Sequence, residues 1–391
     1  MDFSHVRIDD APPCGRLGFC QTADLTGNGL PDIIVGGMGR EGVTTVAGKR
    51  LVLSRMPLIG DLIRRREYNV FWYENPGWER HDVVQQTDLC VGATMADIDS
   101  DGTPELIVGE NNGTGLYWFD PAPDPRDPWT THLITDTFTK YHDTAVGDVD
   151  GDGDDELVIL SQESKIIGYY DIPADPTVSP WPENNQHIIA TDLLVEGVAI
   201  ADIDHDGSPE LIAGANVFSK NGSSWRQQAI AEDWLWTRIV VHDIDGDGRD
   251  EIIMSEGDLP YQGDRLGRVG IVDTQTWDID LLEEELHCPH SVAVADVTGS
   301  GSPDLLIGEM GLGSHHTPRL FLYANDGSGH FTRHTIQEGI PTHEAAFVDL
   351  TGDGRPDIVG KPYGPDRHVD IWFNQIDAQP KMPVQSGGTG A

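Results

Sequence analysis

A nine-residue acidic pattern recurs seven times along the chain, and no other feature constrains the fold as strongly. The copies begin 41 to 73 residues apart and read DLTGNGLPD (24–32), DIDSDGTPE (97–105), DVDGDGDDE (148–156), DIDHDGSPE (202–210), DIDGDGRDE (243–251), DVTGSGSPD (296–304) and DLTGDGRPD (349–357). A repeat of about fifty residues is the length of one four-stranded blade of a β-propeller. The pattern therefore predicts seven blades, numbered here in chain order.

Every copy of the acidic pattern has similar flanks. A run of small apolar residues precedes it, as in HSVAVA, and a β-rich run follows, as in LVILSQ. An aromatic segment such as NVFWYENP comes next, weakest in blade 4 (NVFSKNG), and a fourth segment such as WERHDVV ends the repeat. We therefore expect strands A to D in each blade, with the acidic pattern as the turn between strands A and B.

The seventh repeat has no fourth strand after it, and the N-terminus offers one. Residues 3–10 (FSHVRIDD) resemble a D strand, and pairing them with blade 7 would remove the open edges of the ring. The sequence thus predicts an all-β fold, a seven-bladed β-propeller whose N-terminal strand closes the last blade. We expect residues 1–376 to form this single domain and residues 377–391 to be a disordered tail.

The charge of the chain limits its partners. Lys and Arg number 25 against 66 Asp and Glu, which gives a formal net charge of −41. Such a chain repels phosphate, so we expect neither nucleic acid nor membrane as a partner. Acidic residues in this excess, with few Lys, are what we expect of a halophile. Lacking a leader pattern, the chain is predicted to be cytoplasmic, although a secreted form with its leader removed would have the same sequence.

The acidic turns present oxygen ligands at alternate positions of a tight loop, as hard cations such as Ca²⁺ require. Four copies have the full pattern, and their predicted structural calcium ligands are Asp97, Asp99, Asp101, Glu105, Asp148, Asp150, Asp152, Glu156, Asp202, Asp204, Asp206, Glu210, Asp243, Asp245, Asp247 and Glu251. The other three copies are thinned, with residues such as Thr26, Asn28 and Thr351 in place of carboxylates. The alternative is a hydrogen-bonded Asx turn without metal.

With these seven motifs the chain resembles the FG-GAP/VCBS repeat β-propellers. The resemblance covers nearly the whole length and implies the propeller fold with calcium bound at the turns. Members of this group include the integrin α-subunit head, which binds proteins. Others are sugar lyases and the propeller domain of aldos-2-ulose (anhydrofructose) dehydratase. Because one fold supports all these functions, the resemblance by itself does not choose among them.

Ionisable residues gather at one aligned position, six residues before the first Asp of each motif. In blade order this position holds Gly18, Val91, His142, Glu196, Thr237, His290 and His343. The next position adds Arg238 and Glu344, and Tyr141 precedes His142. Because strand A otherwise favours small apolar residues, we expect a functional site at the starts of the A strands, on the face opposite the acidic turns. Further polar candidates near this face are Glu110, Asn111, Gln162, Glu256, Glu309, His315 and His316.

Two other features have competing interpretations. His81, His132, His187 and His334 share one position of the outer D strand, which indicates surface packing rather than chemistry. The insertion 38–66 in blade 1 carries seven basic residues on the same face as the expected site. It is either a lid that covers the pocket and attracts an anionic ligand, or a segment that contacts another subunit or neutralises neighbouring carboxylates.

We consider two functions. The first is a carbohydrate-active lyase or dehydratase that acts by β-elimination on a sugar or oligosaccharide, with an anionic one such as a uronate as the expected ligand. His142 would be the base with Tyr141 beside it, and Arg238 would hold the anion. His290, His343 and Glu196 would hold zinc or another divalent transition metal, or would supply the acid. The alternative is a non-catalytic, calcium-stabilised propeller that binds glycans or proteins.

Overall fold

The computed structural model describes residues 2–39, 43–46, 49–52, 68–86, 88–313 and 316–376. The tail 377–391, His315 and most of the basic insertion therefore lie outside the described residues. Within the insertion, only the backbone of a hairpin is described, formed by β4 (Val43–Val46) and β5 (Lys49–Val52). No helix among the described residues is long and apolar enough to cross a membrane.

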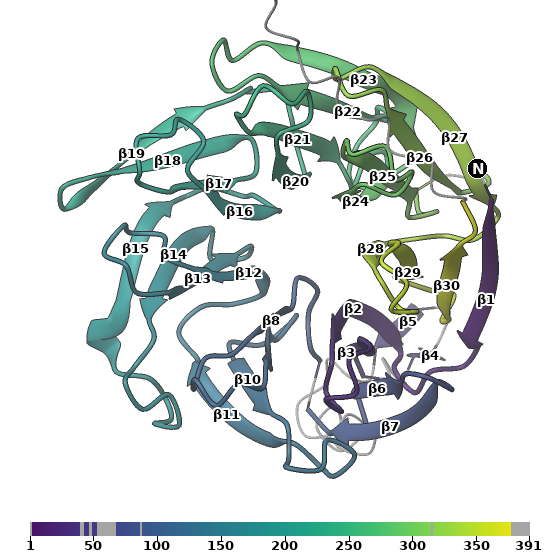
Figure 1. Cartoon of the computed structure of the whole chain (residues 1–391). Helices are drawn as coiled ribbons and strands as arrows, with labels where there is room; N and C mark the ends of the chain where they lie inside the picture. Colours follow the sequence, from purple (N-terminus) through teal and green to yellow (C-terminus); the bar gives the residue numbers. More distant parts are fainter. Residues whose placement is uncertain are drawn as a thin grey trace, which may run out of the picture.

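Seven four-stranded antiparallel sheets form a ring, as Figure 1 shows, so the predicted fold class is confirmed. Blade 1 consists of β2 (Arg16–Ala23), β3 (Asp32–Met38), β6 (Val70–Glu74) and β7 (Glu79–Val84). Blade 2 consists of β8 (Thr94–Ala96), β9 (Glu105–Gly109), β10 (Leu116–Asp120) and β11 (Thr130–Thr135). Blade 3 consists of β12 (Tyr141–Gly147), β13 (Glu156–Ser161), β14 (Ile166–Asp171) and β15 (Gln186–Thr191). Blade 4 consists of β16 (Val198–Ala201), β17 (Glu210–Ala213), β18 (Asn216–Asn221) and β19 (Ser224–Ala229). Blade 5 consists of β20 (Thr237–His242), β21 (Glu251–Glu256), β22 (Gly267–Val272) and β23 (Ile279–Leu286).

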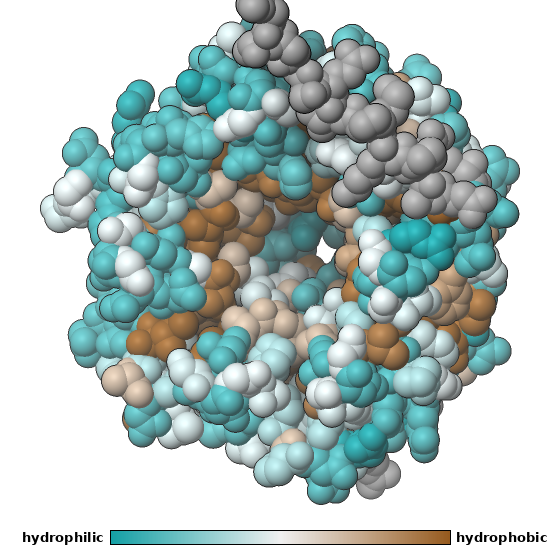
Figure 2. All heavy atoms as spheres, in the orientation of Figure 1, coloured by the Kyte–Doolittle hydropathy of each residue, from teal (hydrophilic) through white to brown (hydrophobic). Residues whose placement is uncertain are grey.

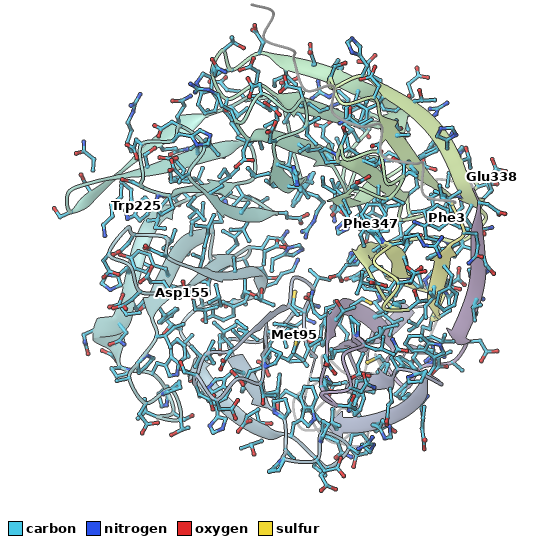
Figure 3. The ribbon with its side chains drawn as sticks, in the orientation of Figure 1. Phe3, Met95, Asp155, Trp225, Glu338 and Phe347 are labelled. Carbon is cyan, nitrogen blue, oxygen red and sulfur yellow. The ribbon has the colours of Figure 1, made fainter. Side chains whose placement is uncertain are left out.

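The ring closes through the N-terminus. Blade 6 consists of β24 (Pro289–Ala295), β25 (Asp304–Glu309), β26 (Arg319–Asn325) and β27 (Phe331–Glu338). Blade 7 consists of β28 (Glu344–Val348), β29 (Asp357–Lys361), β30 (Val369–Asn374) and, from the N-terminus, β1 (Phe3–Asp9). Strand β1 pairs antiparallel with β30, with His5 opposite Trp372. In Figure 3 Met95 and Phe347 of inner strands lie by the channel, while Phe3 and Trp225 of outermost strands lie at the rim. The first strand of the chain thus completes the last blade, as predicted.

Hydrophobic cores fill the spaces between neighbouring blades. Seven clusters of buried side chains join the blade pairs 1–2, 2–3, 3–4, 4–5, 5–6, 6–7 and 7–1. Trp72, Trp118 and Trp372, all from C strands, are fully buried in these layers. Apolar residues on both faces of the B strands explain the continuous apolar runs in the sequence, because each blade is covered on both sides.

The acidic turns share one hydrogen-bonded frame. In all seven, the carboxylate at position 9 accepts the backbone N–H of position 2 at 2.7–3.3 Å, as between Glu105 and Ile98. The Asp at position 1 accepts the N–H of the glycine at position 6, as between Asp97 and Gly102. This glycine has φ between 82° and 96°, a conformation that other residues rarely adopt. Part of each turn is therefore self-satisfied, as the alternative interpretation required.

The thinned turns differ from the full turns in a second way. Their position 9 is Asp rather than Glu, and its second oxygen accepts the backbone N–H of an Asn at the end of strand C. The side chain of this Asn donates to a carbonyl of the preceding blade, as from Asn75 to Leu350. Blades 1, 6 and 7 are thus joined to their neighbours by Asn side chains around the point where the ring closes.

The histidines of the D strands have a packing role. His81 stacks on Trp72, His132 on Trp118 and His187 on Tyr169, with 4.1–4.7 Å between ring centroids. Each aromatic partner lies directly opposite its histidine on strand C. This geometry confirms that these three repeated histidines belong to the outer surface of the blade; His334 lies opposite Leu322 in the same register.

Candidate functional site

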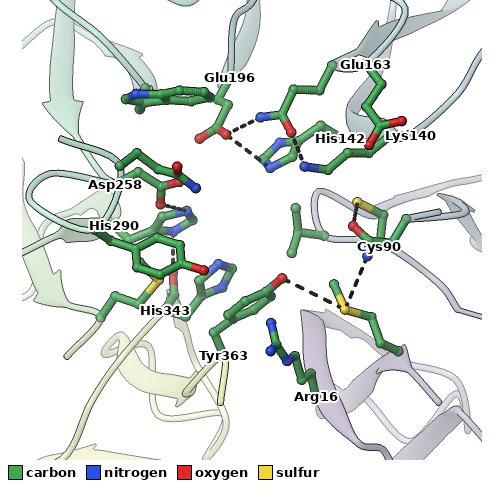
Figure 4. Close-up of a pocket in the computed structure, with 18 of the residues that line it drawn as sticks. Arg16, Cys90, Lys140, His142, Glu163, Glu196, Asp258, His290, His343 and Tyr363 are labelled. Carbon is green, nitrogen blue, oxygen red and sulfur yellow. Dashed lines mark hydrogen bonds and ion pairs between the residues drawn. The ribbon is translucent and has the colours of Figure 1, made fainter. Parts of the chain in front are cut away.

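A pocket of about 530 Å³ lies at the start of the A strands, within the hollow seen at the centre of the ring in Figure 2. Its lining residues, many of them drawn in Figure 4, are Arg16, Met38, Cys90, Val91, Asn111, Asn112, Lys140, His142, Gln162, Glu163, Leu194, Glu196, Trp236, Asp258, Tyr261, Gln262, His290, Met310, His343 and Tyr363. His142, Glu196, His290 and His343, predicted to converge from four blades, do line this one pocket.

The pocket and the acidic turns lie at opposite ends of the inner strands. Strand β12 begins at Tyr141, next to the pocket residue His142, and ends at Gly147, just before the acidic turn that begins at Asp148. At about 3.3 Å per residue, six residues separate the two ends by roughly 20 Å. Chemistry in the pocket is therefore remote from any cation at the turns.

His142 lies between two carboxylates. Its Nδ1 is 2.7 Å from Oδ2 of Asp143, and its Nε2 is 3.4 Å from Oε1 of Glu196. Burial lowers the pKa of His142, but the charges of Glu196 and Asp143 outweigh burial and leave the pKa raised above its ordinary value. The raised pKa favours the protonated ring, which suits an acid, while the role of His142 as the base stays a prediction.

Glu196 is the centre of a polar network. Its Oε1 accepts a hydrogen bond from Nε2 of Gln162, whose own side-chain oxygen accepts one from Lys140. Its other oxygen, Oε2, is buried without a hydrogen-bond partner among the described residues. A carboxylate that is 1% exposed and half satisfied has a strong demand for a proton or a cation.

Asp258, Glu196 and His290 form a group that could hold a metal ion. One potential ligand atom from each lies within 4.8 Å of the others, and Oδ1 of Asp258 is 3.9 Å from Nε2 of His290. Burial, followed by the charge of Glu196, raises the pKa of Asp258 to about 7. Asp258 lies in the loop after strand B of blade 5, outside any repeated position, and was not predicted from the sequence.

His290 and His343 form a stack with Tyr363. The His290 and His343 centroids are 3.9 Å apart, and those of His343 and Tyr363 are 4.8 Å apart. Burial, followed by neighbouring charges, lowers the pKa of both histidines well below the ordinary value, so both rings are neutral. His290 donates from Nδ1 to the carbonyl of His343 at 2.6 Å, which leaves its Nε2 lone pair directed toward Asp258.

Tyr141 is not part of the pocket. It is 1% exposed, packs in the core between blades 2 and 3, and its hydroxyl accepts the backbone N–H of Phe138. Tyr141 therefore points into the core, whereas His142 next to it lines the pocket. The prediction that Tyr141 assists His142 is corrected accordingly.

Arg238 lies beneath the pocket rather than in it. It lines a second chamber of about 210 Å³, which shares Val91, His290 and His343 with the pocket above. Its NH1 donates to Oδ1 of Asp143 at 2.9 Å. Burial raises the pKa of Asp143, but Arg238 and His142 outweigh burial and lower it. Arg238 therefore neutralises a buried carboxylate and is not a free clamp for an anion, contrary to the prediction.

The remaining polar candidates divide into two groups. Asn111 and Gln162 line the pocket, whereas Glu110, Glu256 and Glu309 bind groups of their own blades, such as Arg319 for Glu309. His316 stacks on His287, away from the pocket, and His315 lies outside the described residues. The lining residues missed by sequence reasoning include Arg16 at the start of β2 and, in loops, Lys140, Trp236, Asp258, Tyr261 and Tyr363.

Two of the missed residues have strained backbones. Lys140 (φ 60°) and Trp236 (φ 54°) are in the left-handed region just before the A strands of blades 3 and 5. This conformation is unusual for residues other than glycine and concentrates at functional sites. The ring of Trp236, the exposed ring of Tyr261 and Tyr363 give the pocket aromatic walls beside its amides and charges.

The turns of the four full copies gather carboxylates as predicted. The groups whose ligand atoms lie within 4.8 Å of one another are Asp97, Asp99, Asp101 and Glu105; Asp148, Asp150 and Glu156; Asp202, Asp204 and Asp206; and Asp243, Asp245 and Asp247. None of the thinned turns forms such a group in the described part of the chain. Asp152, Glu210 and Glu251 lie outside the groups, and Asp150 is also paired with Lys220 of blade 4.

Comparisons with known proteins agree with the fold. The sequence profile of the FG-GAP-like repeat matches residues 97–159, 148–213 and 296–360. No curated protein matches the chain. The solved Vibrio cholerae biofilm matrix protein Bap1 is 11% identical, with a TM-score of 0.52 over 97% of this chain and 92% of that one. This likeness shows the fold alone.

A second solved structure, the Photorhabdus luminescens Tc holotoxin pore, is 13% identical with a TM-score of 0.41. The match covers 93% of this chain but only 17% of the toxin chain. The three repeat matches and the ring of seven sheets identify the fold on independent grounds. The chain is therefore a seven-bladed β-propeller that contains FG-GAP-like repeats.

Proposed function

We propose that the protein is a carbohydrate-active carbon–oxygen lyase whose active site is the pocket at the start of the A strands. The observation that carries this proposal is the convergence of His142, Glu196, Asp258 and His290 on one pocket with aromatic walls. Aromatic rings and amides suit the alternating C–H and hydroxyl surfaces of a sugar. A simple binding site has no need for several proton-transfer groups in contact with one another.

The arrangement suits β-elimination with Asp258 as base and His142 as acid. The Asp258 carboxylate would take the proton from the carbon next to a carbonyl or carboxylate, and the electron pair left behind forms the enolate. The double bond forms as the bond from the β-carbon to oxygen breaks, and His142 gives its Nε2 proton to that oxygen. A base with a pKa of about 7 and an acid whose pKa is raised above that of an ordinary histidine match this task.

A transition metal fits one side of the pocket. Glu196, Asp258 and His290 would hold it, replacing the predicted set in which His343 stood in place of Asp258. One nitrogen and two carboxylates with a fourth side open toward the pocket suit zinc or a similar ion, and the orphan Oε2 of Glu196 needs a cation. Such an ion would stabilise the enolate as a Lewis acid. Asp258 would then be a ligand rather than the base.

At the acidic turns we propose structural calcium. The four gathered carboxylate groups offer the oxygen ligands that this cation prefers. Calcium there would neutralise clustered charges in a chain of net charge −41 and hold each A–B hairpin. We expect the ions to stabilise the fold and to take no part in the reaction.

The test combines a substrate screen with metal analysis. Uronate-containing polysaccharides and 2-keto sugars are incubated with the protein, and the absorbance of unsaturated products is recorded. We expect turnover by the wild type and loss of at least about 100-fold in the His142→Ala and Asp258→Asn variants. Specific glycan or protein binding without turnover would instead support the non-catalytic alternative. Retention of a transition metal by the wild type after calcium removal, together with its loss in Asp258→Asn, would assign Asp258 as a ligand.

A further inference from the structure

Lys361 places a fully buried ammonium group directly beneath the pocket, at the end of β29. Its side chain is 0% exposed, and Nζ donates to the carbonyls of Leu17 at 3.0 Å and Gly18 at 2.5 Å. Nζ also lies 2.9 Å from Nδ1 of His343. An ammonium group has three N–H donors, so these three acceptors satisfy it completely. Oε2 of Glu344, 3.4 Å away, balances its charge.

This contact determines which nitrogen of His343 carries the proton. In the ammonium form of Lys361, an N–H that points at Nδ1 requires a lone pair there, and the neutral ring then has its proton on Nε2. The ring cannot easily turn over, because it is packed between His290 and Tyr363. The described residues provide no hydrogen-bond partner for Nε2 of His343, and this ring lines the pocket.

The two stacked histidines are therefore opposite in character. His290 presents an Nε2 lone pair because its Nδ1 donates to the carbonyl of His343. His343 presents an Nε2–H because its Nδ1 accepts from Lys361. The two stacked rings, with centroids 3.9 Å apart, thus place a hydrogen-bond donor (Nε2–H of His343) next to a hydrogen-bond acceptor (Nε2 of His290).

We propose that Nε2–H of His343 is the hydrogen-bond donor for an electron-rich oxygen of the ligand, a carbonyl or carboxylate oxygen, and that Lys361 is the positioning residue that holds His343 in this tautomer. The tautomer of His343 is independent of the proposed lyase function, and only the role of this donor in the reaction rests on that function. There, the oxygen that gains negative charge in the enolate would lie at His343. A neutral donor that is already oriented stabilises such a charge without reorganisation.

The tautomer is tested without any substrate, by ¹⁵N NMR of the full-length protein labelled at histidine. His343 is assigned from the signal that disappears in His343→Gln. We expect proton coupling at Nε2 and none at Nδ1. A proton on Nδ1, or a doubly protonated ring at neutral pH, would overturn the proposal.

The role of Lys361 is tested by Lys361→Met combined with Glu344→Gln, which removes both buried charges together so that neither is left unpaired. We expect the double variant to fold and the His343 signals to show a mixture of the two tautomers. Glu344→Gln alone is the matched control and should keep the proton on Nε2. A double variant that also keeps a pure Nε2–H tautomer would show that Lys361 does not set it.

The use of the donor is tested by two substitutions of His343. Gln can place an N–H near the position of Nε2, whereas the shorter Asn cannot reach it. We expect His343→Gln to retain about a tenth or more of the elimination rate and His343→Asn to lose about 100- to 1,000-fold, the usual effect of removing one such donor. Equal losses would contradict the donor role. If the wild type has no lyase activity, the proposed function fails while the NMR results still decide the tautomer.

Discussion

The imidazole of His5 lies on the indole of Trp372 with 5.2 Å between the ring centroids. His81 has the same relationship to Trp72 inside blade 1, where both residues belong to one continuous repeat. In blade 7 the two rings come from opposite ends of the chain. The N-terminal strand therefore repeats the chemistry of a D strand as well as its position.

Deleting residues 1–11 should lower the Tm by more than about 5 °C, because the deletion exposes the edge of β30 and leaves the buried carboxylate of Asp370 without His5 and Arg7. Differential scanning calorimetry measures this change. Val6→Ala is the matched control: Val6 is 39% exposed on the same strand, and its loss should cost little. A deletion variant that melts within a degree or two of the wild type would refute closure by β1.

Asp245→Asn should reduce the number of tightly bound calcium ions by one. Asp245 belongs to a gathered group in blade 5, and replacing a carboxylate with an amide removes a charged ligand. Equilibrium dialysis with elemental analysis gives the number of ions. The corresponding change in a thinned turn, Asp353→Asn in blade 7, should leave the number unchanged. The distinction between full and thinned turns is wrong if both variants lose calcium.

Without calcium, the protein should be less stable at pH 8 than at pH 5. Burial, opposed by a backbone hydrogen bond, raises the pKa of Glu105 to about 8 and of Glu156, Glu210 and Glu251 to about 7. A carboxyl whose pKa is raised on folding stabilises the fold below its unfolded pKa, and this contribution is lost as the pH rises through the folded value. Each of these four Glu residues contributes roughly 1–3 kcal/mol to the loss of stability as the pH rises.

Thermal unfolding in a chelator from pH 4.5 to pH 8.5 measures this dependence. Saturating calcium should flatten it, because the ion favours the ionised ligands. Glu105→Gln, which cannot titrate, should show a weaker dependence than the wild type in the chelator. An apo protein that becomes more stable as the pH rises would contradict the raised pKa values.

His142→Ala, in the pocket, should lower the elimination rate, whereas Tyr141→Phe, in the core, should not. The first removes the proposed acid and should slow elimination by about 100- to 10,000-fold. The second removes a hydroxyl that is buried between blades 2 and 3, so the rate should stay within about twofold. Initial rates on the substrate found in the screen measure both effects. A large loss in Tyr141→Phe at unchanged Tm would return Tyr141 to the site.

Arg238→Ala should destabilise the fold rather than weaken substrate binding alone. It leaves the Asp143 carboxylate, which is 3% exposed, without its guanidinium partner, and breaking a buried pair in this way typically costs about 3–5 kcal/mol. Urea unfolding measures the loss. Adding Asp143→Asn to the same variant should restore much of the stability. Normal stability with a raised KM would instead support the anion clamp.

Local sequence determined the blades, their order and the closing strand. The acidic turns repeat within each blade, and a hairpin turn depends on a few adjacent residues, so seven similar segments fold alike. The same repeat aligned His142, Glu196, His290 and His343, because equivalent positions of A strands meet around one axis. The sequence likewise distinguished the four turns that have the full set of carboxylates from the three thinned turns that lack it.

Only the tertiary structure decided how the aligned residues are used. Asp258 comes from a loop without a repeated position, and Lys361 reaches His343 from a neighbouring strand. The direction of Tyr141 and the pairing of Arg238 with Asp143, 95 residues apart, were equally hidden. Side-chain direction and charge pairing depend on contacts between blades, and such contacts leave no periodic signal in the chain.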